Sequence, residues 1–201
     1  MKHLNAGLAA AAAAVVIALA AFAAGAASAA TVGSKAPDFA LPDASGTTHT
    51  LSQYKGKIVV LEWTNPQCPF VKRHYAAGTM KKLAAKYADQ GVVWLTIDSS
   101  HFARPEDMRK WTESEGLKYP VLLDPSGATG QAYGAKTTPH MFVIDRDGKL
   151  VYSGAIDDDP RGENAQPRNY VDEVLAKLVK GEQPDVRETA SYGCSVKYAK
   201  K

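Results

Sequence analysis

The stretch KIVVLEWTNPQCPFVKRHY, residues 57–75, joins an apolar run to a cysteine, a proline and three basic side chains. The run 57–63 is continuous rather than alternating, which is typical of a strand buried on both faces of a sheet. Pro69 suits the first turn of a helix, because the N–H that proline lacks would have no partner there. The stretch therefore predicts a strand, a turn carrying Cys68, and a helix.

The rest of the chain continues this alternation of strands and helices. The other expected elements are strands at 92–97 and 121–124, helices at 69–86 (interrupted near Gly78), 105–115 and 169–179, and a hairpin at 140–154. Strands that alternate with helices and end in an antiparallel hairpin predict a mixed sheet covered by helices on both faces. The predicted fold class is α/β.

The first thirty residues resemble a secretory signal peptide. A basic start at Lys2 precedes the apolar run 8–24 and the small-residue cleavage site at 27–29. A membrane anchor is the alternative, but the run is mostly alanine. The prediction is a signal peptide at 1–30, one folded domain at 31–182 and a C-terminal tail at 183–201. Export implies a periplasmic or secreted protein, with no stable membrane insertion after cleavage.

The charge pattern favours no charged macromolecular partner. The net charge is +3 with 22% charged residues, and no basic stripe carries interleaved aromatics, so we expect no nucleic-acid partner. The acidic run 157–159 lacks the spacing of a calcium loop and is interpreted as a solvated acidic loop. No metal or organic cofactor is expected.

Cys68 lies where an open α/β sheet places its functional groups, at the carboxyl end of a central strand. At the start of a helix, the N–H groups of Phe70 and Val71 are expected to point back at the sulfur. The basic residues 72–74 oppose the helix dipole, which is unfavourable for the helix but favourable for a negative sulfur. We therefore expect a cysteine with a lowered pKa, although solvated surface residues are the alternative interpretation for the cations.

The second cysteine, Cys194, stands beside Gly193 in the polar tail, in the sequence YGCSVKY. In an exported chain the two cysteines could form one disulfide, Cys68–Cys194. As a permanent link closing so long a loop, this bond would stabilise the fold by roughly 5 kcal/mol. As a reactive pair, Cys68 would be the attacking thiolate and Cys194 the resolving thiol. Both interpretations stay open.

Thr138-Pro139 immediately precedes the strand of the hairpin, a place where proline can only begin a strand. This bond is a candidate for the cis form, although base rates favour trans. The adjacent His140 could contact the site, but a hydrogen-bonded structural histidine is the preferred interpretation.

Several motifs together resemble the thioredoxin-like superfamily. They are G-x-x-A-P-D-F at 33–39, the strand ending in Trp63, Cys68-Pro69, Thr138-Pro139 before a hairpin, and the terminal YGCSVKY. The branch they resemble is the alkyl hydroperoxide reductase/thiol-specific antioxidant family, and within it the bacterial peroxiredoxin-like redoxins. The resemblance implies a thioredoxin-like fold and an antioxidant thiol oxidoreductase acting in cell redox homeostasis.

The resemblance also implies a redox cycle. Cys68 would attack a peroxide or a protein disulfide, Cys194 would resolve the product, and an external thiol reductant would restore both thiols. Thr138 and Pro139 would flank the site, and no metal or cofactor would take part. The alternative is a non-enzymatic binding or scaffold domain in which Cys68–Cys194 is a structural disulfide.

The chain departs from the family pattern at several points. A typical peroxiredoxin has a threonine three residues before its cysteine, whereas Thr64 is four before it and Pro66 only two. The arginine that supports the thiolate has only Arg104 as a candidate. Val71 stands where a C-x-x-C motif has its second cysteine, and the C-x-x-x-C spacing of copper chaperones is absent. These departures leave open whether the substrate is a peroxide or a disulfide.

Overall fold

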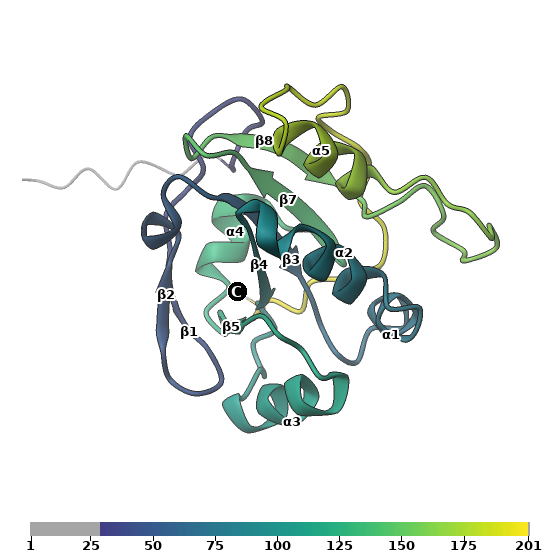
Figure 1. Cartoon of the computed structure of the whole chain (residues 1–201). Coiled ribbons are helices and arrows are strands. Elements are labelled where there is room, and N and C mark those ends of the chain that lie inside the picture. Colours follow the sequence, from purple (N-terminus) through teal and green to yellow (C-terminus); the bar gives the residue numbers. More distant parts are fainter. Residues whose placement is uncertain (1–28, 201) are drawn as a thin grey trace, which may run out of the picture.

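The computed structural model describes residues 29–200 (Figure 1). The predicted signal peptide, apart from its last two positions, lies outside the described residues. The strands are β1 (Ala40–Pro42), β2 (Thr48–Thr50), β3 (Ile58–Trp63), β4 (Val92–Asp98), β5 (Val121–Leu123), β6 (Thr137–Thr138), β7 (His140–Ile144), β8 (Leu150–Gly154) and β9 (Cys194–Ser195). The helices are α1 (Pro69–Ala76), α2 (Thr79–Tyr87), α3 (Pro105–Glu115), α4 (Ala128–Tyr133) and α5 (Tyr170–Leu178), with short 3-10 helices at Leu51–Tyr54 and Ala88–Gln90.

The central sheet has five strands in the order β5-β4-β3-β7-β8. Strands β3, β4 and β5 are parallel, whereas β7 runs antiparallel to both β3 and β8. The central strand β3 is buried along its whole length, as its continuous apolar run predicted. The mixed sheet with helices on both faces confirms the predicted α/β class.

Two hydrophobic cores lie on the two faces of the sheet. Along β3, Ile58 and Val60 belong to one core, and Val59, Leu61 and Trp63 to the other, because successive side chains of a strand point to opposite faces. Helices α1, α2, α3 and α5 pack on the first face. The short helix α4 and the β1–β2 hairpin pack on the second (Figure 1).

The predicted long helix at 69–86 is two helices. Gly78 stands between α1 and α2 with a φ of 72° and interrupts the helical path, as the sequence predicted. The short α1 therefore holds only the residues that follow Cys68. Its inner face packs Val71 and Tyr75 into the core.

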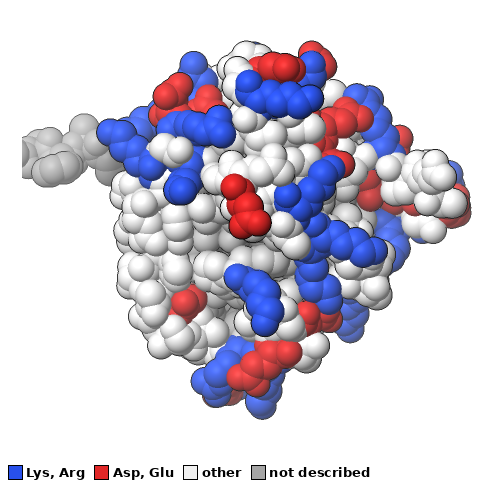
Figure 2. All heavy atoms as spheres, in the orientation of Figure 1, with Lys and Arg blue, Asp and Glu red and all other residues white. Residues whose placement is uncertain are grey.

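Lysines and arginines lie among acidic side chains on the face drawn in Figure 2. Two of the ion pairs join elements that pack together: Lys86 of α2 with Asp172 of α5 at 2.6 Å, and Lys81 of α2 with Glu115 of α3 at 3.0 Å. Such partly exposed pairs contribute little to stability. Within residues 29–200, no helix is both long enough and apolar enough to cross a membrane.

Candidate active site

Cys68 is placed by a turn that begins where β3 ends. The backbone N–H of Cys68 donates to the carbonyl of Asn65 at 2.9 Å, which closes a four-residue turn with Pro66 at its second position. The Asn65 side chain accepts from the N–H of Gln67 at 2.7 Å and donates to Ser100 at 2.9 Å. This fixed turn explains why the proline lies only two residues before the cysteine.

Cys68 itself is the N-cap residue of α1 and its side chain is only 3% exposed. Its thiol donates to the carbonyl oxygen of Thr138 at 3.0 Å. Burial raises the pKa of Cys68, but hydrogen bonds from Cys194, the Thr138 side chain and the Val71 N–H outweigh it and lower the pKa below its ordinary value. The contribution of the Val71 N–H agrees with the sequence-based expectation.

The Thr138-Pro139 bond is cis. Thr138 is buried, and its hydroxyl has no hydrogen-bond partner among the described residues. That hydroxyl is nevertheless one of the groups that lower the pKa of Cys68. Both observations are explained if the hydrogen-bond partner of the sulfur depends on its protonation. The protonated thiol donates to the Thr138 carbonyl, whereas a thiolate would accept a hydrogen bond from the Thr138 hydroxyl.

His140 is a structural histidine, as preferred from the sequence. Its Nδ1 accepts from the N–H of Lys136 at 3.2 Å, and its Nε2 lies 3.3 Å from the hydroxyl of Ser153. Burial lowers the pKa of His140 to about 4, and the charge of Lys136 acts in the same direction. The ring is therefore neutral at pH 7.

The C-terminal tail returns to the site as strand β9, a pairing that the sequence did not predict. Cys194 is opposite Thr138 and Ser195 opposite Thr137 in an antiparallel pair. The tail is held further on by hydrogen bonds from Val196 N–H to the Lys136 carbonyl at 3.1 Å and from His101 N–H to the Lys197 carbonyl at 2.9 Å. The tail thus crosses the carboxyl end of the sheet and brings all four predicted site residues together.

The two cysteines, both free thiols here, have unequal surroundings. Burial and the neighbouring Cys68 raise the pKa of Cys194 to about 11, whereas the pKa of Cys68 is lowered. Cys194 is also the more exposed of the two. The site therefore holds a buried thiol with a lowered pKa and a partly exposed thiol with a raised pKa.

The contacts of Arg73 and His74 do not support the expected role of the basic residues 72–74 at the sulfur. The Arg73 guanidinium donates to the carbonyls of Pro160 and Asp159, both at 2.9 Å, and His74 contacts Tyr192. Lys72 is exposed. None of the three is among the groups with the largest effects on the pKa of Cys68. Arg73 and His74 make their contacts with the loop 157–169 and with Tyr192 instead of the sulfur.

Arg104 does not support the sulfur either. Its side chain is 66% exposed and pairs with Asp107 at 3.1 Å and Glu106 at 3.6 Å, at the start of α3. Arg104 therefore does not take the part of the arginine that supports the thiolate in typical peroxiredoxins.

The acidic run 157–159 is only partly a solvated loop. Asp158 is exposed, but Asp157 is 4% exposed and accepts a hydrogen bond from the hydroxyl of Tyr192. The sequence analysis missed both Asp157 and Tyr192 as partners. The position of Tyr192 two residues before Cys194 was the available signal.

Glu62 is the other group that the sequence analysis did not single out. It lies within β3 with no exposed surface and accepts hydrogen bonds from Trp94 at 3.0 Å and Tyr75 at 3.1 Å through one oxygen. The other oxygen has no partner among the described residues. Burial raises the pKa of Glu62 to about 7, against the lowering effect of these bonds.

Comparison with known proteins places this geometry in a family. Residues 32–153 match the AhpC/TSA family, which is more than half of the chain. The chain belongs to the AhpC/TSA family. The matched region includes Cys68, Thr138 and Pro139, but ends before Cys194.

Individual relatives agree with the family and the fold. The chain is 35% identical over 120 residues to the thiol-disulfide oxidoreductase ResA of Geobacillus thermodenitrificans, an alignment that covers 59% of this chain and 66% of that relative. A hypothetical protein from Sinorhizobium meliloti 1021 superposes with a TM-score of 0.77 at 30% identity, covering 87% of this chain and 98% of the other. A putative thiol:disulfide interchange protein DsbE from Chlorobium tepidum superposes with a TM-score of 0.56 at 30% identity, covering 62% and 85%. The AhpC/TSA protein described here therefore has a thioredoxin-like fold.

Proposed function

We propose that this AhpC/TSA protein is a thiol oxidoreductase that cycles between the free thiols of Cys68 and Cys194 and a disulfide between them. One observation carries the proposal: β9 pairs Cys194 with Thr138, whose carbonyl oxygen accepts the Cys68 thiol at 3.0 Å. The opposite pKa shifts support the assignment of roles, because the thiolate is the nucleophile. Relatives named thiol-disulfide oxidoreductases support the same class of activity.

The proposed cycle has three balanced steps. With a peroxide, the Cys68 thiolate attacks one oxygen and the O–O bond breaks; the departing alkoxide or hydroxide takes up the proton that Cys68 released on ionising, so the products are a sulfenic acid and an alcohol or water. The Cys194 sulfur then attacks the Cys68 sulfur, the S–O bond breaks, and the hydroxyl leaves as water with the proton of Cys194. An external dithiol returns two electrons and two protons and restores both thiols.

Two features favour different electrophiles for the first step. The 3% exposure of Cys68 favours a small molecule such as a peroxide, because a protein disulfide would have to displace the tail to reach the sulfur. The names of the relatives favour a disulfide, on which Cys68 would form a mixed disulfide that Cys194 resolves. In both cases we expect Thr138, whose carbonyl contacts the sulfur, and the adjacent Pro139 to flank the reacting thiol.

The test compares wild type, Cys68→Ser and Cys194→Ser in the reduced state. Stopped-flow oxidation by hydrogen peroxide and by a protein disulfide such as insulin gives the rate constant for each electrophile. We expect Cys68→Ser to abolish the reaction, and Cys194→Ser to stop it at a sulfenic acid or a mixed disulfide. A peroxide rate no faster than that of a free thiol would remove the peroxidase option. No reaction with either electrophile would leave the scaffold alternative.

We also propose export, on the strength of the signal-peptide pattern at residues 1–30. The expected mature protein begins near Ala30 or Thr31 and is found in the periplasm or the medium. Cell fractionation and N-terminal sequencing of the native protein check this. Recovery of the full chain in the membrane fraction would favour the anchor alternative.

A further inference from the structure

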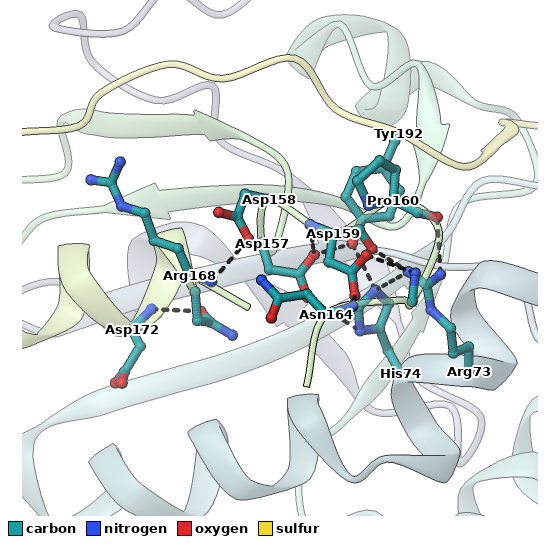
Figure 3. Close-up of polar contacts among 12 residues, drawn as sticks. Arg73, His74, Asp157, Asp158, Asp159, Pro160, Asn164, Arg168, Asp172 and Tyr192 are labelled. Carbon is teal, nitrogen blue, oxygen red and sulfur yellow. Dashed lines mark hydrogen bonds and ion pairs between the residues drawn. The ribbon is translucent and has the colours of Figure 1, made fainter. Parts of the chain in front are cut away.

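A buried polar cluster lies where the tail approaches helix α1 (Figure 3). It consists of His74 from α1, Asp157 from the loop after β8, and Tyr192 from the tail. His74 and Asp157 are each only 4% exposed. The cluster thus ties together three segments that are far apart in the sequence.

The hydrogen bonds of the cluster converge on the phenol of Tyr192. Its hydroxyl donates to Oδ1 of Asp157, in a short contact, and lies 2.9 Å from Nε2 of His74. Nε2 of His74 contacts both the tyrosine oxygen and, at 3.4 Å, the Arg73 guanidinium, which can only donate, so the tautomer of His74 sets which of the two contacts is a hydrogen bond. Asp157 is in turn fixed by the N–H of Asp159 at 3.1 Å.

The ring of Tyr192 also contacts the segment that follows Cys68. It lies 6.0 Å from the ring of Phe70, centroid to centroid, and 6.0 Å from the guanidinium carbon of Arg73. Tyr192 stands two residues before Cys194, and Phe70 stands two residues after Cys68. The phenol is therefore an anchor point immediately upstream of β9.

We infer that Tyr192 is a positioning residue, held by Asp157 and His74, that keeps the Cys194 sulfur within reach of Cys68. The inference rests on the proposed function, because it concerns the same cysteine pair. The phenol touches neither sulfur and takes no part in the chemistry. It acts by restricting the path of residues 193–194, which Gly193 alone would leave free.

The quantity that Tyr192 sets is the effective concentration of Cys194 at Cys68. Equilibration with glutathione measures it without knowledge of the natural substrate. The Cys68 thiolate attacks glutathione disulfide and one glutathione leaves; Cys194 then attacks the mixed disulfide and releases the second. Two protein thiols are oxidised and one glutathione disulfide is reduced to two glutathiones. The equilibrium constant of this exchange therefore reports how favourable formation of the Cys68–Cys194 disulfide is.

The experiment compares this constant in wild type and Tyr192→Phe. The phenylalanine keeps the ring against Phe70 but removes the bonds to Asp157 and His74. We expect the constant to fall about tenfold, because tenfold corresponds to about 1.4 kcal/mol, roughly the contribution of one hydrogen bond to a charged group. Asp157→Asn is expected to lower it by a smaller factor, because the amide oxygen still accepts the phenol proton.

Tyr87→Phe is the matched control. Tyr87 is 2% exposed and its hydroxyl donates to an aspartate, Asp172, at 2.6 Å, but it joins α2 to α5 rather than to the tail. The Tyr87→Phe variant loses the same kind of hydrogen bond, from a tyrosine hydroxyl to an aspartate. We expect its equilibrium constant with glutathione to stay within twofold of the wild-type value. Thermal unfolding of the reduced proteins measures the general loss of stability in both variants.

Two results would overturn the inference: a constant for Tyr192→Phe within twofold of wild type, or an equal fall in Tyr87→Phe. Failure of the proposed function looks different. In that case reduced wild type reacts with neither hydrogen peroxide nor insulin, although glutathione can still close a structural Cys68–Cys194 disulfide whose equilibrium constant depends on Tyr192. A wild-type disulfide that Tyr192→Phe leaves unaffected removes the positioning role alone.

Discussion

Gly193 lies directly against the backbone of Thr138. A Cβ on Gly193 would overlap the carbonyl oxygen of Thr138, the same atom that accepts the Cys68 thiol. Gly193 also has a φ of 130°, a conformation that side chains disfavour. The close approach of the two cysteines therefore depends on a residue without a side chain between Tyr192 and Cys194.

The first prediction concerns this contact. We expect Gly193→Ala to push Cys194 away from Thr138 and to slow formation of the Cys68–Cys194 disulfide at least tenfold. Gly148→Ala is the control, because Gly148 also has a positive φ of 79° but has open space where its Cβ would stand. Both variants place an alanine at a positive φ and carry the same kind of backbone strain. They differ in that only Gly193→Ala is expected to displace Cys194. Equal disulfide rates in the two variants would contradict the prediction.

The second prediction concerns the order in which the two thiols ionise. We expect the rate of alkylation of Cys68 to rise with pH at a pKa below its ordinary value, and that of Cys194 to rise only near pH 11. Peptide mass spectrometry after labelling of the reduced protein at a series of pH values measures both. Because Cys194 helps to lower the pKa of Cys68, Cys194→Ala should raise it. Faster labelling of Cys194 than of Cys68 at pH 7 would reverse the assigned roles.

The third prediction separates the reactivity of Cys68 from stability. Thr138→Val removes a buried hydroxyl that has no partner in the thiol state, so the free energy of unfolding should change by less than about 1 kcal/mol. The pKa of Cys68 should rise, because the hydroxyl is one of the groups that lower it. Thr137→Val is the control: it loses a bond to the Pro139 carbonyl at 2.9 Å and should leave the pKa of Cys68 unchanged. An unchanged pKa in Thr138→Val would exclude the hydroxyl as a thiolate donor.

The fourth prediction concerns Glu62. Its folded pKa of about 7 lies above the value of 4.5 for a free glutamate, so between these values the folded protein binds more protons than the unfolded chain. Stability must then fall as pH rises from about 4.5 through 7, by roughly 3 kcal/mol in total. Glu62→Gln should remove this decline, because the amide never ionises.

Urea unfolding of reduced wild type and Glu62→Gln at pH 5 and pH 8 measures the effect. The difference between the two proteins isolates Glu62, because all other titratable groups are the same in both. An exposed carboxyl, Glu163, supplies the control Glu163→Gln. Parallel pH profiles for wild type and Glu62→Gln would show that the buried carboxyl does not titrate in this range.

Much of the fold follows from local patterns that act within a few residues. The continuous apolar run before Trp63 predicts the central strand, because a strand covered on both faces needs apolar side chains on both. Pro69 and Gly78 mark the start and end of α1 through their backbone properties alone. The position of Cys68 at the turn and of Thr138-Pro139 before the hairpin could also be predicted from the sequence, because both follow from the residues directly next to them.

The sequence alone also supplied Cys194 as the second cysteine, but only tertiary structure decided where it lies. The pairing of β9 with β6 depends on contacts between residues that are far apart in the chain, and no local pattern specifies them. The same holds for the side chains of residues 72–74, whose direction depends on what packs around α1. Composition and spacing fix which residues are available; the three-dimensional arrangement of Tyr192, Gly193 and Thr138 decides that two distant thiols meet, because burial and hydrogen bonding act between neighbours in space.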